Sequence, residues 1–250
     1  MFKKYIILLK ESNKKHILLG IITGITAFVL CLCIAVISIV HSPSVYQAAY
    51  RKGCVDSAYN IDSDNFDKYY TVLTEFLTNN DTDVLTSATF KANDKMQSIF
   101  TQADVELLQS YGNAFVLIRV IAIISALMIT AVFATLGLRR GKQAVSETAC
   151  WALMPYLLLF LFAFVWLILE ASFGGNAVGV LYQTLSLGAL ASYAGGNLSL
   201  FYGTVTMQTF ASALLTMVVV FGVIILLVIL SLCKAVFKKH RDENEDFLYQ

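Results

Sequence analysis

Few side chains in this sequence could exchange a proton near neutral pH. Among its 250 residues are three histidines, His16, His41 and His240. Imidazole is the group whose ordinary pKa lies closest to neutrality, so a pair of histidines would be the simplest acid–base machinery. The charge pattern described below places His16 and His240 on the cytoplasmic side. His41 is then the one histidine near the outer face, where it has no imidazole partner.

No motif for metal-assisted or nucleophilic catalysis accompanies the histidines. The sequence contains no CxxC, no Cys/His cluster with zinc spacing, no HExxH, no glycine-rich phosphate loop and no serine nucleophile elbow. Of the five cysteines, only Cys54 falls in a polar segment, which argues against a disulfide-stapled outer domain. We therefore predict no metal site and no cofactor.

Two ionisable residues inside apolar segments require a partner. Arg119 lies within the second apolar segment, and Glu170 lies near the outer end of the third. A lone charge placed deep in a bilayer costs about 2.5 to 3.5 kcal/mol on insertion scales. We expect Arg119 and Glu170 to form an ion pair. The alternative is that Arg119 binds a lipid phosphate or a substrate.

The composition places these residues in a membrane protein. Hydrophobic residues make up 58% of the chain and charged residues 14%, and the mean hydropathy is +0.70. A soluble domain carries about 25% charged residues, so this chain has too few charges to cover a water-exposed surface. The net charge of +1 gives no basic field for nucleic acid. Membrane lipids are the expected surroundings, and nucleic acid is not an expected partner.

Four segments are apolar and long enough to cross a bilayer, which takes about 20 residues of helix. They are residues 17–41, 114–138, 151–172 and 207–233. The predicted fold class is an all-α integral membrane protein with four transmembrane helices, a small helical extracytoplasmic domain and an interfacial or re-entrant outer loop. Within that loop, the uncharged stretch 177–194 is interfacial, re-entrant or spanning. A Gly20–Gly24 GxxxG motif in the first span predicts close helix contact, within the chain or in a dimer.

Lysine and arginine counts predict the orientation. Twelve of these cations lie in the terminal segments and in the 139–150 loop, against five in segment 42–113 and none in segment 173–206. Because cationic loops stay in the cytoplasm, both termini are expected to be cytoplasmic. Residues 1–16 would then form a cytoplasmic interfacial segment and 234–250 a cytoplasmic tail, whereas 42–113 and 173–206 would face outward.

Segment 42–113 shows two helical patterns. The first begins with a cap at Ser63 or Asp64, ends at residues 79–81 and has one apolar face. That face comprises Phe66, Tyr69, Tyr70, Leu73, Phe76 and Leu77. The second would begin with a cap at Asn93. Its apolar face comprises Met96, Phe100, Ala103, Leu107 and Tyr111.

This layout resembles the bacterial Lit family of lipoprotein intramolecular transacylases. Residues 65–77 look like the tyrosine-rich helix of the family, and residues 104–108 look like its Asp-Val segment before the second span. The resemblance implies a four-span protein that moves an acyl chain from the lipid-modified glycerol of a lipoprotein to its N-terminal amine. It also implies two catalytic histidines on the outer side.

Neither histidine is present at the corresponding positions of this sequence. The residue three before Asp104 is Thr101, and the closest match to the second histidine is Tyr182. Neither side chain serves as a base at its ordinary pKa. If the chain is active, Asp104 is a possible base and Tyr182 a possible acid, with Glu170 as another candidate because desolvation would raise its pKa.

Three functional hypotheses follow. The leading one is a non-catalytic protein on a Lit-like scaffold that binds lipid, lipoprotein or a protein partner at the outer face. The second is a divergent lipoprotein or lipid acyltransferase that uses carboxylates instead of histidines. The third, a permease subunit or channel, is disfavoured because the spans contain few polar residues and no charged path.

Overall fold

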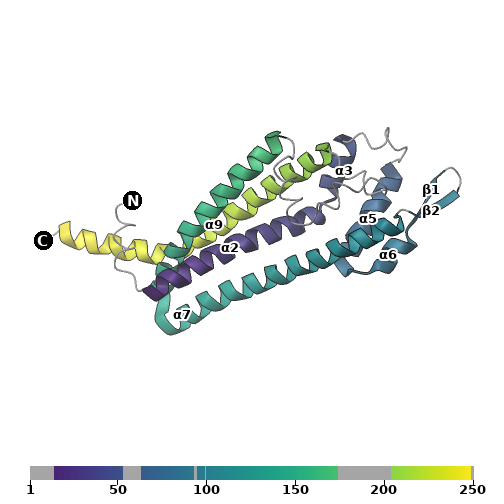
Figure 1. The fold of residues 1–250 in the computed structure, drawn as a ribbon. Helices are drawn as coiled ribbons and strands as arrows, with labels where there is room; N and C mark the ends of the chain where they lie inside the picture. The colour runs from purple at the N-terminus through teal and green to yellow at the C-terminus, as the bar shows by residue number, and fades with distance from the viewer. Residues whose placement is uncertain (1–13, 53–62, 93–94, 99, 174–203, 249–250) are drawn as a thin grey trace. The chain divides into compact units, whose positions relative to one another are not determined.

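A computed structural model describes residues 14–52, 63–92, 95–98, 100–173 and 204–248 (Figure 1). The elements in chain order are α2 (Lys14–Val40), α3 (Pro43–Lys52), α5 (Ser63–Asn79), α6 (Thr82–Ser87), β1 (Thr89–Ala92), β2 (Lys95–Ser98), α7 (Gln102–Phe173) and α9 (Thr204–Leu248). The helical membrane fold expected from the sequence is therefore confirmed. The predicted segment 1–16 and the outer loop 173–206, with its stretch 177–194, lie mostly outside the described residues.

Three of the described helices are long and apolar enough to cross a membrane. They cover Lys14–Val40, Asp104–Leu169 and Ala211–Cys233. The second has 66 residues, which at 1.5 Å per residue is about 99 Å of helix, roughly three times the thickness of a hydrocarbon core. It is therefore long enough to cross twice.

Gly141 divides α7 into two legs. Its backbone angles, φ 80° and ψ −177°, are not helical. A positive φ of this kind favours glycine, because a Cβ would strain the backbone. Figure 1 shows α7 reversing direction between its two legs, while the other residues of the expected 139–150 loop are helical. The two legs of α7 are thus joined at one non-helical residue rather than by an extended loop.

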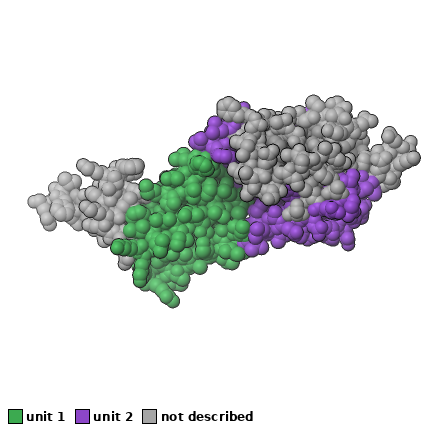
Figure 2. All heavy atoms as spheres, viewed as in Figure 1, with its two compact units in different colours: residues 1–34, 121–164, 218–250 green, residues 35–120, 165–217 purple. Residues whose placement is uncertain are grey.

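The chain forms two compact units (Figure 2). Unit 1 comprises residues 1–34, 121–164 and 218–250, and unit 2 comprises residues 35–120 and 165–217. The buried core of unit 1 consists of Ala27, Ala149, Cys150, Tyr156, Ile229 and Cys233. Unit 1 thus draws its core from α2, from the second leg of α7 and from α9.

The GxxxG motif of α2 makes its close contact inside unit 1. A Cβ on Gly20 would meet the Cβ of Trp151 and would lie 2.8 Å from the carbonyl oxygen of Thr148. A Cβ on Gly24 would meet the carbonyl oxygen of Ala152 and would lie 2.7 Å from Cγ of Pro155. The small residues therefore let α2 approach the second leg of α7, which is the intramolecular form of the two expected uses.

A buried hydrogen bond joins α7 to α9 in the same unit. The Tyr156 hydroxyl donates to the carbonyl oxygen of Gly222 at 2.8 Å, and Tyr156 is fully buried. A Cβ on Gly222 would collide with the ring of Phe160. Because a buried phenol needs a partner, this bond fixes the register of the two helices.

Unit 2 contains a second core, built on the first of the two predicted outer helices. The apolar face of α5 is buried through Leu73, Phe76 and Leu77, which confirms that helix and its face. The other buried members are Tyr46, Leu85, Ala88, Phe100, Val105, Leu108 and Phe115. The side chains of Phe66 and Tyr69 lie outside the described set.

The second predicted outer helix begins later than expected, so that prediction was wrong at its start. Residues 89–98 form an antiparallel hairpin in which Phe90 pairs with Gln97 and Lys91 pairs with Met96. The register leaves two residues, 93–94, to join the strands, and two-residue connections are the commonest in hairpins. The helix begins at Gln102. Met96 therefore belongs to a strand and not to the helical face.

Candidate functional site

The sequence positions singled out for catalysis include the start of α7, where Thr101 and Asp104 bond each other reciprocally. The Thr101 amide and hydroxyl both donate to Oδ2 of Asp104, at 2.8 and 2.7 Å. The Asp104 amide donates back to the Thr101 hydroxyl oxygen at 3.2 Å. The Val105 amide then donates to the Thr101 carbonyl at 3.0 Å. This is a capping box with aspartate in the place of the usual glutamate.

The capping box gives Asp104 a structural task. Its side chain is fully buried, with 0% exposure, and Oδ2 already accepts two hydrogen bonds from Thr101. A general base needs a free acceptor within reach of the substrate proton. In this arrangement, Oδ2 instead accepts from one main-chain amide and one hydroxyl, both of Thr101, at the start of the helix.

Arg119, which lies further along α7, caps a different helix. Its Nη1 donates to the Thr78 carbonyl at 2.7 Å and its Nη2 donates to the Leu77 carbonyl at 2.9 Å. Both oxygens belong to the last turn of α5, where carbonyls lack helical partners and the helix dipole is negative. The guanidinium carbon also lies 4.6 Å from the centre of the Phe115 ring. The charge of Arg119 is thus stabilised by backbone dipoles and an aromatic face.

His41 lies next to this cation. Its ring is tilted against Phe115, with 6.0 Å between the ring centres. Partial burial, followed by the positive charge of Arg119, lowers the pKa of His41. Both effects favour the neutral imidazole, which is the form that a general base needs.

No second imidazole accompanies His41 in the described part of unit 2. His16 belongs to unit 1, where its Nδ1 lies 3.1 Å from the Thr148 hydroxyl. His240 lies within α9, also in unit 1. The described part of unit 2 therefore contains one of the two histidines that a two-histidine mechanism requires.

The remaining candidates have no described side-chain geometry. Glu170 is part of α7, but its side chain lies outside the described set, and Tyr182 lies in segment 174–203, which is also outside it. Within the described residues, no group of three or more His, Cys, Asp and Glu side chains is arranged to hold a metal ion. The structure therefore brings together Thr101 with Asp104, and His41 with Arg119.

Sequence reasoning missed the two partners of Arg119 for a clear reason. They are main-chain carbonyls, at Leu77 and Thr78, and main-chain groups carry no residue-type signal. The capping box, in contrast, could have been found from Thr-x-x-Asp before an apolar run.

Comparisons with known proteins agree with this architecture. The profile of the family described as "Lipoprotein intramolecular transacylase Lit" matches residues 21–173, more than half of the 250 residues. The in meso structure of the membrane-integral lipoprotein intramolecular transacylase Lit from Bacillus cereus is similar, with a TM-score of 0.63, 12% identity and coverage of 92% of this chain and 99% of that one. No curated protein matches the sequence. The chain belongs to the Lit family of integral membrane proteins.

Proposed function

We propose that this Lit-family protein binds lipid, lipoprotein or a protein partner at the outer face of the cell membrane, and that it does not perform histidine-dependent acyl transfer. The observation that carries the proposal is Thr101. It stands three residues before Asp104, where the family resemblance implies a catalytic histidine. Here its hydroxyl and its amide are both bonded to the Asp104 carboxylate. A side chain that caps a helix in this way offers no base for a substrate amine.

The chemistry of the transfer supports the same proposal. Moving an acyl chain to an amine requires a group that takes up a proton near neutral pH. A threonine hydroxyl does not do so, and the removal of one general base costs about 10²- to 10⁴-fold in rate. The lowered pKa of His41 favours its neutral form, but its charged neighbour is the cation Arg119, and the described part of unit 2 contains no second imidazole. Residual transfer is therefore expected to be slow.

The proposed binding side follows from charge. With both termini cytoplasmic, unit 2 contains the outward-facing residues of segment 42–113, and the family name describes a reaction on lipoproteins. Arg119 uses two of its five N–H donors on the carbonyls of Thr78 and Leu77, so it remains a candidate for contact with a lipid phosphate. A lipoprotein, a membrane lipid or a membrane protein is the expected class of partner.

The test uses a Gram-positive host that lacks its own transacylase. The full chain is expressed, and mass spectrometry reads the N-termini of the host lipoproteins. We expect the diacylglyceryl form with a free amine, while the Lit protein of Bacillus cereus expressed in parallel should produce the N-acyl form. Co-purified lipoprotein or lipid, absent from a mock purification, is the expected sign of binding.

Two results would contradict the proposal. An N-acyl, monoacylglyceryl product would identify a divergent acyltransferase, and Glu170→Gln and Tyr182→Phe would then be examined first because they leave the Thr101 cap intact. A purified chain that carries neither lipoprotein nor a specific lipid would argue against the binding role.

A further inference from the structure

A groove opens in unit 1 between the start of α2 and the end of the first leg of α7. Its volume is about 380 Å³, within the range of small-molecule sites. The lining residues are Lys15, His16, Leu18, Leu19, Ile22, Thr135, Leu136, Arg139 and Arg140. This set combines cations with aliphatic side chains and contains no acid.

The polar end of the groove is built on a buried histidine. His16 is 7% exposed and Thr148 is fully buried. Nη1 of Arg140 lies 3.2 Å from Nε2 of His16, and Nδ1 of His16 lies 3.1 Å from the Thr148 hydroxyl. Because a guanidinium only donates, Nε2 accepts, and the ring proton is on Nδ1. The His16 imidazole thus accepts from Nη1 of Arg140 and leaves the other N–H donors of this guanidinium available for a ligand.

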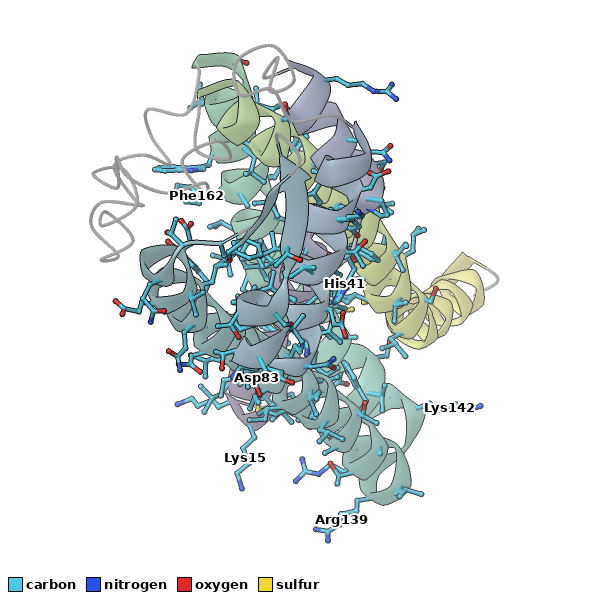
Figure 3. All side chains as sticks on the ribbon, turned by 90° about the vertical axis from the view of Figure 1, so that its right-hand side faces the viewer. Lys15, His41, Asp83, Arg139, Lys142 and Phe162 are labelled. Carbon is cyan, nitrogen blue, oxygen red and sulfur yellow. The ribbon has the colours of Figure 1, made fainter. Side chains whose placement is uncertain are left out.

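Two further cations share this end of the unit. Lys15 and Arg139 line the groove with Arg140, and in Figure 3 both extend beyond the ribbon at the same end. Lys142, also close to the Gly141 turn, extends in a different direction (Figure 3) and does not line the groove. The groove therefore collects three positive charges, which fit an anion.

The apolar end of the groove distinguishes a lipid from a free anion. Leu18 and Ile22 are 62% and 44% exposed, and both belong to a helix apolar enough to cross a membrane. Leu136, on the facing helix, is buried at 8% exposure. A free phosphate would not contact these aliphatic side chains, whereas the acyl chain of a lipid would pack against them. Basic pockets between transmembrane helices are a recurrent form of anionic lipid site.

We propose that this groove binds one anionic phospholipid, with its phosphate on Arg139, Arg140 and Lys15 and an acyl chain along Leu18 and Ile22. The site is separate from the outer residues of unit 2. It also differs from a general positive flank, because the contacts with His16 and Thr148 fix the orientation of one guanidinium. A cationic flank that only fixes membrane orientation would not need a guanidinium held in one position.

The experiment measures lipid binding to the purified full chain by native mass spectrometry in detergent. The probes are phosphatidylglycerol, phosphatidylcholine and inorganic phosphate. We expect adducts with phosphatidylglycerol at concentrations at which the other two give none. Arg139→Gln and Arg140→Gln should each weaken binding about fivefold, since a cation near an anionic surface contributes about 1 kcal/mol.

Two matched variants separate a built site from charge. Lys142→Gln removes a cation near the same turn and should leave phosphatidylglycerol binding unchanged. His16→Phe keeps every cation but removes the acceptor for Arg140, so binding should weaken. Circular dichroism melting checks that each variant is folded. If His16→Phe does not fold, Arg139→Gln still tests the site, because Arg139 is exposed and its replacement should not disturb the fold.

Several outcomes would overturn the site. Equal losses in Lys142→Gln and Arg140→Gln, with His16→Phe silent, would reduce the groove to a charged flank. Binding of phosphatidylcholine as tight as that of phosphatidylglycerol would exclude recognition of an anionic headgroup. Inorganic phosphate that competes at the same concentration would indicate a free-anion site.

Discussion

The guanidinium of Arg119 donates 2.9 Å to the carbonyl oxygen of Leu77, 42 positions earlier in the chain. Together with the 2.7 Å bond to Thr78, this contact ties α7 to the C-terminal end of α5. The last turn of a helix has carbonyls without partners, and a cation there is favourable. Arg119 therefore stabilises unit 2 from a position inside the apolar stretch of α7.

Arg119→Leu should lower the stability of unit 2. Hydrogen bonds to charged groups contribute about 1.5 to 3 kcal/mol each, and the two carbonyls of α5 would lose their donors. We expect a clear fall in the melting temperature in detergent, with partial recovery in Arg119→Lys, which restores the charge but not the two-pronged geometry. Lys142→Leu, which removes an exposed cation of unit 1 that does not line the groove, is the control.

The predicted ion pair between Arg119 and Glu170 has a separate test. If the two side chains interact, Glu170→Gln should lower the melting temperature, and the double variant should lose less than the sum of the single losses. Additive losses would show that Arg119 is stabilised by Leu77, Thr78 and Phe115 without the carboxylate.

His41 should make the stability of unit 2 depend on pH. Burial and the charge of Arg119 lower its pKa in the folded chain, so the unfolded chain binds a proton more readily. The stabilisation is therefore present above the ordinary histidine pKa of about 6.5 and is lost as the pH falls through that value toward the lower folded pKa. His41→Gln should flatten the decline in melting temperature on this acid side. An unchanged pH profile would exclude His41 as its source.

The cap at Thr101 predicts that its variants affect folding rather than chemistry. Thr101→Ala should lower the free energy of unfolding by about 0.5 to 2 kcal/mol, whereas Thr101→Ser should be close to neutral because it keeps the hydroxyl. Asp104→Asn should also destabilise the chain, because the two Thr101 donors bond one carboxylate oxygen and a neutral amide oxygen accepts such bonds less strongly than an ionised one. Chemical denaturation monitored by circular dichroism measures these differences. An Asp104→Asn variant of unchanged stability would remove the structural explanation of this carboxylate.

The parts of the fold that the sequence predicted are those in which one signal extends over many residues. Apolar runs of about 20 residues predicted the spans, and the spacing of Leu73, Phe76 and Leu77 predicted α5. The hairpin at 89–98 was missed because strands of four residues are too short to show a period of two. The spacing of Met96, Phe100 and Ala103 imitates a helical face by chance.

The candidate site was predicted less completely, because its contacts depend on distant main-chain groups. The charge on Arg119 indicated that a partner was needed, but no residue pattern identifies the carbonyls of Leu77 and Thr78. The GxxxG motif predicted close packing of α2, yet only the structure shows that Thr148 and Ala152 are the neighbours. A motif of small residues predicts that another helix packs closely against it, but it does not identify that helix.

Gly24 should tolerate no side chain. A Cβ at this position would meet the Ala152 carbonyl and Cγ of Pro155, and overpacking of this kind costs about 1 to 3 kcal/mol. Gly24→Ala should therefore lower the melting temperature. Gly137→Ala is the matched control, because its Cβ would lie 3.8 Å from Val145, an ordinary contact, and alanine favours the helix. A lower oligomeric state in Gly24→Ala, with an unchanged melting temperature, would show that the motif serves a dimer instead.

The orientation can be tested with two new cysteines. Native Cys150 is a poor reporter because it is only 6% exposed. Lys142 and Asp83 are both exposed, and the Lys142 side chain extends away from the ribbon in Figure 3. In a chain without its native cysteines, Asp83→Cys should react with an impermeant maleimide added to intact cells. Lys142→Cys should react only after permeabilisation, because the cationic connection is expected to stay in the cytoplasm. The reverse pattern would invert the orientation and would move the proposed lipoprotein-binding side to the cytoplasm.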